Sequence, residues 1–345
     1  MIQHTARPYW ITLIVLAAAL LLSVMVGSVF ISPGDLLATL VAALRGDTAL
    51  TGELRSYSTI LFSLRLPRTV LIVMTGAALA ASGTAYQGLF RNPLADPYLI
   101  GVASGAGLGA VAAMSLNWPY TTVGLLAVPL AAFGAGLVTV LIVYELARIG
   151  RAVPATNLVL AGVAVSSFAT ALTSFLMLRS TGELRRALVW LLGGSTLGGW
   201  QPVLALLPYW LVGLGTLLTM GHALNVLQFG DEQAQQLGLP VNRVRRIIIA
   251  AASLTTAAAV AFAGIIGFVG LIVPHILRML AGGDYRRLLP LSLLAGAAML
   301  LLADVLSRVV MAPQELPVGV ITALAGAPFF LWVLRRTRQN SYWGS

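Results

Sequence analysis

The chain has 345 residues, of which 59% are hydrophobic and only 9% charged, and its mean hydropathy is +0.92. Soluble domains carry about 25% charged residues, so this composition excludes a water-soluble globular protein and indicates one that lies in a lipid bilayer. The net charge of +10 comes from 21 basic residues, all arginine, against 11 acids, and the sequence contains no cysteine. Without lysine there is no phosphate-binding loop of the Walker type, and without cysteine there are no disulfides or thiolate metal sites.

Few residues offer catalytic or metal-binding chemistry. The three histidines, His4, His222 and His275, lie too far apart in the sequence to form a helix-spaced ligand set. We therefore expect no metal site, no cofactor and no enzymatic activity in this chain alone. The arginines are spread between apolar segments, which is typical of charges that flank membrane helices and argues against a nucleic-acid partner.

Ten apolar segments are candidates for membrane spans, because a spanning helix needs about 20 mostly apolar residues. The sequence therefore predicts an all-α, polytopic membrane protein with about ten transmembrane helices, organised as one domain over residues 1–345. Turn residues around Asn117 divide the apolar stretch 97–144, and the glycines Gly264, Gly267 and Gly270 divide the stretch 247–277, and each stretch is long enough for a pair of spans. The expected spans are 9–31, 68–87, 97–115, 121–146, 157–178, 203–222, 247–265, 268–282, 288–307 and 316–335.

An even number of spans predicts that both termini lie on the same side of the membrane. Arg335, Arg336 and Arg338 follow the last span, and the enrichment of arginine in cytoplasmic segments favours cytoplasmic termini. The first apolar run is longer than that of a signal peptide, about 7–15 residues, so we expect it to be an uncleaved span.

Ionisable groups within spans usually mark ion coupling. Here Asp304 and Arg308 lie near the outer end of the ninth expected span, where they could pair, and Glu315 follows. No carboxylate falls near a predicted midplane, which weakens the alternative of an ion-coupled secondary transporter. A purely structural membrane subunit is a second alternative.

Glycines recur at helical spacing at Gly101, Gly105 and Gly109. Such a strip lacks side chains, so another helix can approach it closely. The strip indicates either helix packing alone or a smooth wall beside a transport pathway.

Several longer motifs resemble a known family. They include Arg65-Leu-Pro-Arg68, the segment from Tyr86 to Pro97, Gly230-Asp-Glu-Gln-Ala-Gln-Gln-Leu-Gly238, Gly267 to His275, and Glu315-Leu-Pro-Val-Gly319. In this order, and over nearly the whole chain, they resemble the permease subunit of the BtuC/FecCD-type ABC importers for cobalamin, ferric siderophores or heme.

The resemblance implies partners and a location. A second permease copy would complete a homodimer in the bacterial cytoplasmic (inner) membrane. Two ATP-binding cassette ATPase subunits, which hold ATP and Mg, would bind on the cytoplasmic side. A periplasmic or lipid-anchored solute-binding protein would dock on the outer side. The pathway would then open alternately to the two sides.

The resemblance also assigns roles to particular residues. Arg65, Arg68 and Arg308 resemble the arginines that pair with acidic residues of the binding protein, although interfacial snorkelling is an alternative. The inside loop at about 223–246 resembles the segment that couples to the ATPase, with Asp231 as a helix cap and Gly238 at the helix end. The coupling residues are Gly230, Asp231, Ala234, Leu237 and Gly238.

Two further groups carry expectations. Ala155, Thr156 and Asn157 begin the fifth span, where the family places its cytoplasmic gate, and Thr156 is also a plausible helix cap. Arg179, Arg185 and Arg186 lie in an outside segment with Glu183 and could attract an anionic solute. Heme, many ferric siderophores and cobalamin all carry anionic groups, so these arginines do not choose among them.

Overall fold

The computed structural model describes residues 3–27, 29–45, 52–116, 122–150, 153–179, 184–194 and 198–342, and these residues form helices with short connections and no β-strand. Besides α-helices there is a π-helical segment, η1 (Ile60–Arg65), and a 3-10 helix, η2 (Pro97–Ile100). The α-helices are α1 (Gln3–Met25), α2 (Pro33–Arg45), α3 (Glu53–Thr59), α4 (Leu66–Phe90), α5 (Val102–Met114), α6 (Thr122–Ala147), α7 (Ala155–Arg179), α8 (Leu184–Leu191), α9 (Gln201–Thr219), α10 (Gly221–Leu227), α11 (Asp231–Gln236), α12 (Val241–Ala263), α13 (Val269–Ala281), α14 (Tyr285–Val309) and α15 (Val318–Tyr342).

The all-α polytopic architecture is confirmed. Seven helical stretches in the described part of the chain are long and apolar enough to cross a membrane, and three shorter apolar helices lie among them, α5, α13 and α15. Each of the ten expected segments corresponds to one of these helices. The third segment is shorter than expected because η2 and a turn at Gly101 take up its first residues. The expected turn around Asn117 lies outside the described residues.

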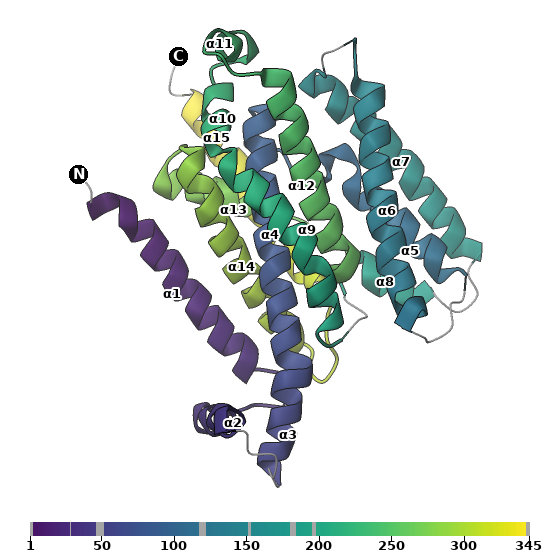
Figure 1. Cartoon of the computed structure of the whole chain (residues 1–345), viewed down its shortest axis with the longest axis vertical. Helices are drawn as coiled ribbons and strands as arrows, with labels where there is room; N and C mark the ends of the chain where they lie inside the picture. The colour runs from purple at the N-terminus through teal and green to yellow at the C-terminus, as the bar shows by residue number, and fades with distance from the viewer. Residues whose placement is uncertain are drawn as a thin grey trace.

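A continuous helix from Glu53 to Phe90 (α3, η1 and α4) forms the centre of the molecule (Figure 1). Its most apolar stretch is 89% buried, whereas those of α1 and α7 are only 22% buried. Helices α9, α12, α13 and α14 pack around α4. The exposed apolar side chains of α1 and α7 are therefore available to lipid or to a membrane partner.

Glycines set the closest helix crossings. Gly76 meets Gly296 where α4 crosses α14, and Gly83 meets Gly270 where α4 crosses α13. A Cβ at Gly83 would overlap the carbonyl of Gly270, so these backbones approach as only small residues allow. The break after α12 occurs at Gly264, whose φ is +79°, and this agrees with the expected division of that apolar stretch.

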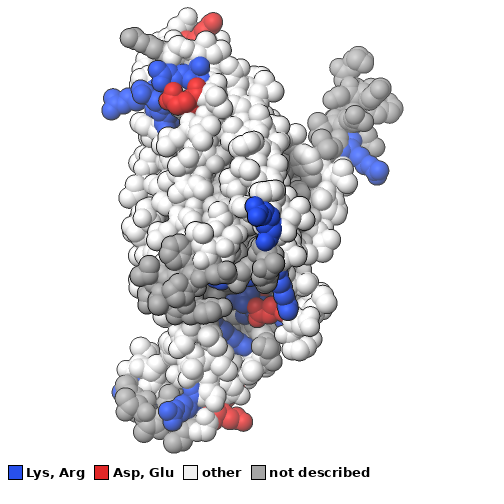
Figure 2. Space-filling view, turned by 90° about the vertical axis from the view of Figure 1, so that its right-hand side faces the viewer, with Lys and Arg blue, Asp and Glu red and all other residues white. Residues whose placement is uncertain are grey.

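The two ends of the molecule differ. Helix α11 stands at one end, which we call the α11 end, and α2 and α3 project from the opposite end, the α3 end (Figure 1). Both chain termini lie toward the α11 end (Figure 1), as an even number of crossings requires. Figure 2 shows a broad uncharged area on the left of the face seen there, between charged groups near the top and others in the lower half, with further basic groups toward the right.

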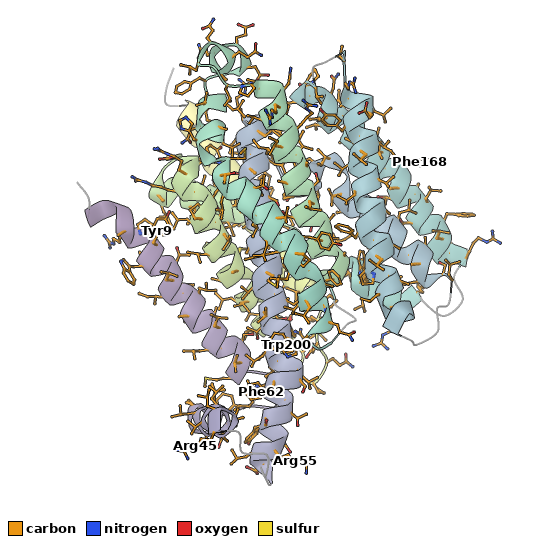
Figure 3. The ribbon with its side chains drawn as sticks, viewed as in Figure 1. Tyr9, Arg45, Arg55, Phe62, Phe168 and Trp200 are labelled. Carbon is orange, nitrogen blue, oxygen red and sulfur yellow. The ribbon has the colours of Figure 1, made fainter. Side chains whose placement is uncertain are left out.

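The projecting α3 end has a small core of its own. Ile31, Leu36 and Leu61 are buried together there. At the same level the indole nitrogen of Trp200 donates to the carbonyl of Phe62, at 3.0 Å, and Figure 3 shows the two residues side by side. This bond fastens the start of α9 to the central helix.

Candidate functional site

Arg65, at the last position of η1, is buried against the end of α1. Its Nη1 donates to the carbonyls of Val24 (2.7 Å) and Met25 (3.0 Å), and its Nη2 donates to that of Val29. The last carbonyls of a helix lack partners within the helix and carry its negative partial charge. Arg65 therefore satisfies and neutralises the C-terminus of α1.

Arg308, near the end of α14, binds the same helix end. Its Nη1 donates to the carbonyls of Ser23 (3.1 Å) and Val26 (2.9 Å). Its Nη2 lies 3.1 Å from Oδ2 of Asp304, one turn earlier on α14. The two arginines together fix the C-terminal end of α1 against η1 and α14.

Arg68 joins the same network from α4. Its Nε and Nη2 lie 3.0 and 2.9 Å from Oδ1 of Asp304, and its Nη1 lies 2.5 Å from Oε2 of Glu315. The Asp304 side chain is fully buried between Arg68 and Arg308, whereas the side chains of Arg68 and Glu315 are 36% and 47% exposed. The network therefore has a buried core and one partly exposed ion pair.

The three arginines expected to dock a binding protein thus lie together, around a pocket of about 640 Å³ at the α3 end. Arg65 and Arg308 are only 7% and 6% exposed, so in this structure their guanidiniums face the chain itself, and their docking role stays a prediction. The free carbonyls of α1 would be costly to bury without donors, and the guanidiniums of Arg65 and Arg308 supply those donors. The buried Asp304 carboxylate accepts from Arg68 at Oδ1 and forms an ion pair with Arg308 at Oδ2. Docking by Arg68 stays a prediction.

At the α11 end, the short helix α11 is held by an ion pair. Asp231 Oδ2 accepts from Nη2 of Arg245 at 2.7 Å, and Arg245 also donates to the carbonyl of Val153 at 3.3 Å. Gly230 and Gly238 flank the helix with φ values of +103° and +84°. Such values are natural for glycine alone, so both glycines shape the turns around α11.

Two details of the coupling prediction are corrected here. Asp231 is the first helical residue and Gly230 occupies the cap position, so the proposed capping role of Asp231 is wrong. Ala234 is fully buried against its own chain, so it does not face a partner. Leu237, which follows α11, is in contrast 66% exposed, and Phe229, which precedes that helix, is 65% exposed. Exposed apolar side chains suited to a partner groove therefore flank the helix, and Ala234 is not one of them.

The expected gate residues lie at the start of α7. The helix begins at Ala155, so Thr156 lies inside it and the alternative role of Thr156 as a cap is wrong. Thr156 is exposed, while Ala155 and Asn157 are half-buried. Nδ2 of Asn157 donates to the carbonyl of Ala147 at 3.5 Å, which links the start of α7 to the end of α6. The gating role stays a prediction.

The glycine strip of α5 packs against α6. A Cβ at Gly105 would overlap the side chain of Thr139, and one at Gly109 would overlap the carbonyl of Ala131. Gly101 has a φ of +85° and forms the turn between η2 and α5. Helix α6 thus covers the glycine strip, which would have to be uncovered to line a transport pathway. Helix packing accounts for these glycines.

A polar row on α7 was not singled out from the sequence. Ser167, Thr170 and Ser174 are all exposed, and their spacing places them on one face of the helix. Phe168 on the same helix is 66% exposed and points away from the rest of the molecule (Figure 3). The hydroxyls of Ser167 and Ser174 bond to the carbonyls four residues earlier. The spacing of hydroxyl residues in an apolar helix was the available signal.

The remaining candidates are placed as follows. Arg179 and Arg185 are exposed, and the guanidinium of Arg179 lies 5.9 Å from the centre of the Phe175 ring, while Glu183 lies outside the described residues. His275 is half-buried, with its ring edge toward Phe329 at 6.4 Å. Within the described residues, no group of three or more His, Asp or Glu side chains could hold a metal ion.

Comparison with known proteins decides the family. The FecCD transport family model matches residues 14–336. The chain belongs to the FecCD transport family. It is 48% identical over 273 residues to the cobalamin import system permease protein BtuC of Halobacterium salinarum, covering 79% of this chain and 72% of the relative. It is 39% identical over 336 residues to the vitamin B12 import system permease protein BtuC of Escherichia coli, covering 94% of each.

Other relatives agree with this assignment. The ABC transporter permease protein YvrB of Bacillus subtilis, whose function is uncharacterised, is 44% identical over 285 residues, covering 82% of this chain and 81% of YvrB. A solved structure of a metal-chelate type ABC transporter, in an inward-facing conformation, superposes with a TM-score of 0.80 at 28% identity, covering 96% of this chain and 99% of that one. The chain is thus a membrane permease of the BtuC/FecCD type of ABC importer.

Proposed function

We propose that this FecCD permease forms the translocation pathway of a binding-protein-dependent importer for a large metal chelate, with cobalamin as the first candidate solute. Two relatives whose names state a solute, both cobalamin (vitamin B12) permeases, are 48% and 39% identical to this chain. Ferric siderophores and heme are the other candidates, since the family resemblance covers them as well. The solute brings its own metal ligands, so the pathway needs no metal-binding residues.

The observation that supports the proposal is that two exposed surfaces of different chemistry lie at opposite ends of the molecule. The α11 end presents exposed Leu237 and Phe229 beside the ion pair of Asp231 with Arg245. The α3 end presents Arg68, partly exposed and charged. A short helix with apolar side chains suits a groove on the ATPase subunit, and a guanidinium suits an acidic binding protein.

The pathway itself requires a second permease copy in this proposal. The exposed hydroxyl row of α7, Ser167, Thr170 and Ser174, would line the space between the two copies, since a polar row is better placed beside a water-filled path than against lipid. The α11 end would face the cytoplasm, together with both termini, and the α3 end the periplasm. ATP and Mg would bind only to the separate ATPase subunits.

Reconstitution tests this function. Proteoliposomes that contain the permease, the ATPase and the binding protein should take up labelled cobalamin only when ATP is present, and a proton ionophore should leave the initial rate unchanged. Ferric siderophores and heme serve as the competing solutes. Uptake that needs no ATPase and stops with the ionophore would instead establish the ion-coupled alternative. The permease alone should not hydrolyse ATP.

A further inference from the structure

We propose that Glu315 is an internal substitute for the binding protein's carboxylate. It occupies the docking guanidinium of Arg68 in the free permease and is displaced when the acidic partner arrives. This inference rests on the proposed function, because it assumes a partner that docks through acidic residues. In this proposal Arg68 favours binding of the partner, whereas Glu315 competes with it.

The two carboxylates that bind Arg68 have unlike surroundings. Asp304 is fully buried and contacts both Arg68, through Nε and Nη2, and Arg308. Removing Asp304 from Arg68 would leave buried charges unpaired, which is strongly unfavourable. Glu315 is 47% exposed and makes a single ion pair, to Nη1 of Arg68. Only the bond to Glu315 can therefore be exchanged without opening the buried part of the network.

The position of Glu315 makes the exchange local. It lies in the connection between α14 and α15, and the next residue is anchored because the amide of Leu316 donates to the carbonyl of Ser307 at 3.0 Å. Release of Arg68 therefore needs movement only of Glu315 and of the residues just before it, while Leu316 stays bonded to Ser307. Both residues line the pocket of about 640 Å³ at the α3 end, together with Gly198 and Gly199. An incoming carboxylate would reach Nη1 through this pocket and replace one oxygen acceptor by another.

The exchange predicts that loss of an acid strengthens binding. In Glu315→Gln and Glu315→Ala the docking guanidinium is no longer occupied by an internal carboxylate. Affinity for the cognate solute-binding protein should therefore rise about two- to five-fold, the range expected for an exposed ion pair. Arg68→Gln should lower the affinity. Glu53→Gln is the matched control, since Glu53 is an exposed acid on α3 at the same end of the molecule, and it should change affinity far less.

A second measurement needs no partner. The chain has no cysteine, so spin labels can be attached to Leu64→Cys and Gln314→Cys, two exposed positions on either side of the pair. In the free permease the distance distribution between the labels should be narrow. It should broaden in Glu315→Ala, and also when the binding protein is added to the labelled permease with Glu315 intact.

The outcomes separate the two proposals. Equal gains in affinity for Glu315→Gln and Glu53→Gln would show that only the net charge matters, and this would overturn the inference. The inference would also be overturned if neither Glu315 variant gained affinity. A distance distribution that Glu315→Ala leaves unchanged would also overturn it. If no acidic partner binds the permease at all, the docking part of the proposed function fails, whereas broadening in Glu315→Ala without a partner would still show that Glu315 holds Arg68.

Discussion

Asp231 of α11 and Arg245 of α12 form an ion pair with a 2.7 Å contact, and the Arg245 side chain is only 9% exposed. Arg245 also donates to the carbonyl of Val153, just before α7. One side chain therefore links the proposed coupling helix to α12 and to the expected gate segment at the start of α7. A displacement of α11 would therefore be transmitted through Arg245 to α12 and to the start of α7.

Replacing Arg245 by Gln should loosen this link. Hydrogen bonds to charged groups contribute about 1.5–3 kcal/mol, so we expect a loss of about that size in permease stability, seen as a lower melting temperature in detergent. Solute-stimulated ATP hydrolysis by the assembled complex should fall by a larger factor than ATPase binding. Arg246→Gln is the control, since Arg246 is an exposed arginine on the same helix. Equal effects of the two substitutions would contradict the linking role.

Leu237 and Ala234 provide a second contrast on α11. Leu237→Asp should leave the melting temperature nearly unchanged, because the side chain is 66% exposed, whereas Ala234→Asp buries a carboxylate at a fully buried position and should destabilise the α11 end. Leu237→Asp should instead weaken assembly with the ATPase subunit, measured by co-purification. Normal assembly and transport in Leu237→Asp would exclude α11 as the coupling helix.

The glycine crossings predict where a single methyl group is not tolerated. Gly83→Ala would place a Cβ against the backbone of Gly270 and should cost at least about 1–3 kcal/mol, as overpacking does. Gly215→Ala is the matched control on α9, because no atom lies within 4 Å of the added Cβ, and it should be neutral or slightly stabilising. Thermal unfolding of the two variants in the same detergent compares them. A Gly83→Ala protein as stable as Gly215→Ala would mean that α4 and α13 can separate freely at this crossing.

Composition and charge-free segments were sufficient to predict the all-α membrane fold, because lipid imposes helices and the segments are long. The break between helices at Gly264 could be predicted from the sequence, since glycine marks turns within apolar runs. The turn at Gly101 carried the same signal. The sequence could not show which residues pair across distant helices. Arg65 and Arg308 lie 243 positions apart (308 − 65) and bind the same end of α1, and nothing local to either residue predicts this.

The same limit explains the errors at the candidate sites. Ala234 and Leu237 are both apolar and lie on one short segment, and only tertiary packing makes one buried and the other exposed. The strip of Gly101, Gly105 and Gly109 was recognised, but its partner helix α6 could not be identified from spacing. The hydroxyl row of α7 carried a usable signal, since three hydroxyl residues at helical spacing stand out in an apolar helix.

The outer arginines give the last prediction, in which stability and docking separate. Arg65→Gln and Arg308→Gln leave carbonyls of α1 without donors, and Arg308→Gln also breaks a buried ion pair with Asp304. Breaking such a pair costs about 3–5 kcal/mol, and each buried carbonyl left without a donor costs about 1–3 kcal/mol. Both variants should therefore melt at clearly lower temperature in the free permease. Arg68→Gln also removes one partner of the buried Asp304, but Arg308 stays paired with that carboxylate and no carbonyl of α1 loses its donor, so the melting temperature should fall by less.

Affinity for the binding protein should depend most on Arg68, the arginine whose loss affects stability least. Arg68→Glu should weaken association with the binding protein, mainly through a slower association rate, and added salt should reduce association of the unaltered permease in the same way by screening. An Arg introduced on the partner should recover part of the affinity lost in Arg68→Glu. Arg55→Glu is the control for charge, since Arg55 is exposed on α3 and lies on the projecting end (Figure 3). If Arg68→Glu binds normally while Arg55→Glu does not, the docking surface lies on the projecting helices instead of around Arg68. The rescue experiment separates the two cases, because an Arg on the partner restores affinity only where it lies opposite the substituted residue.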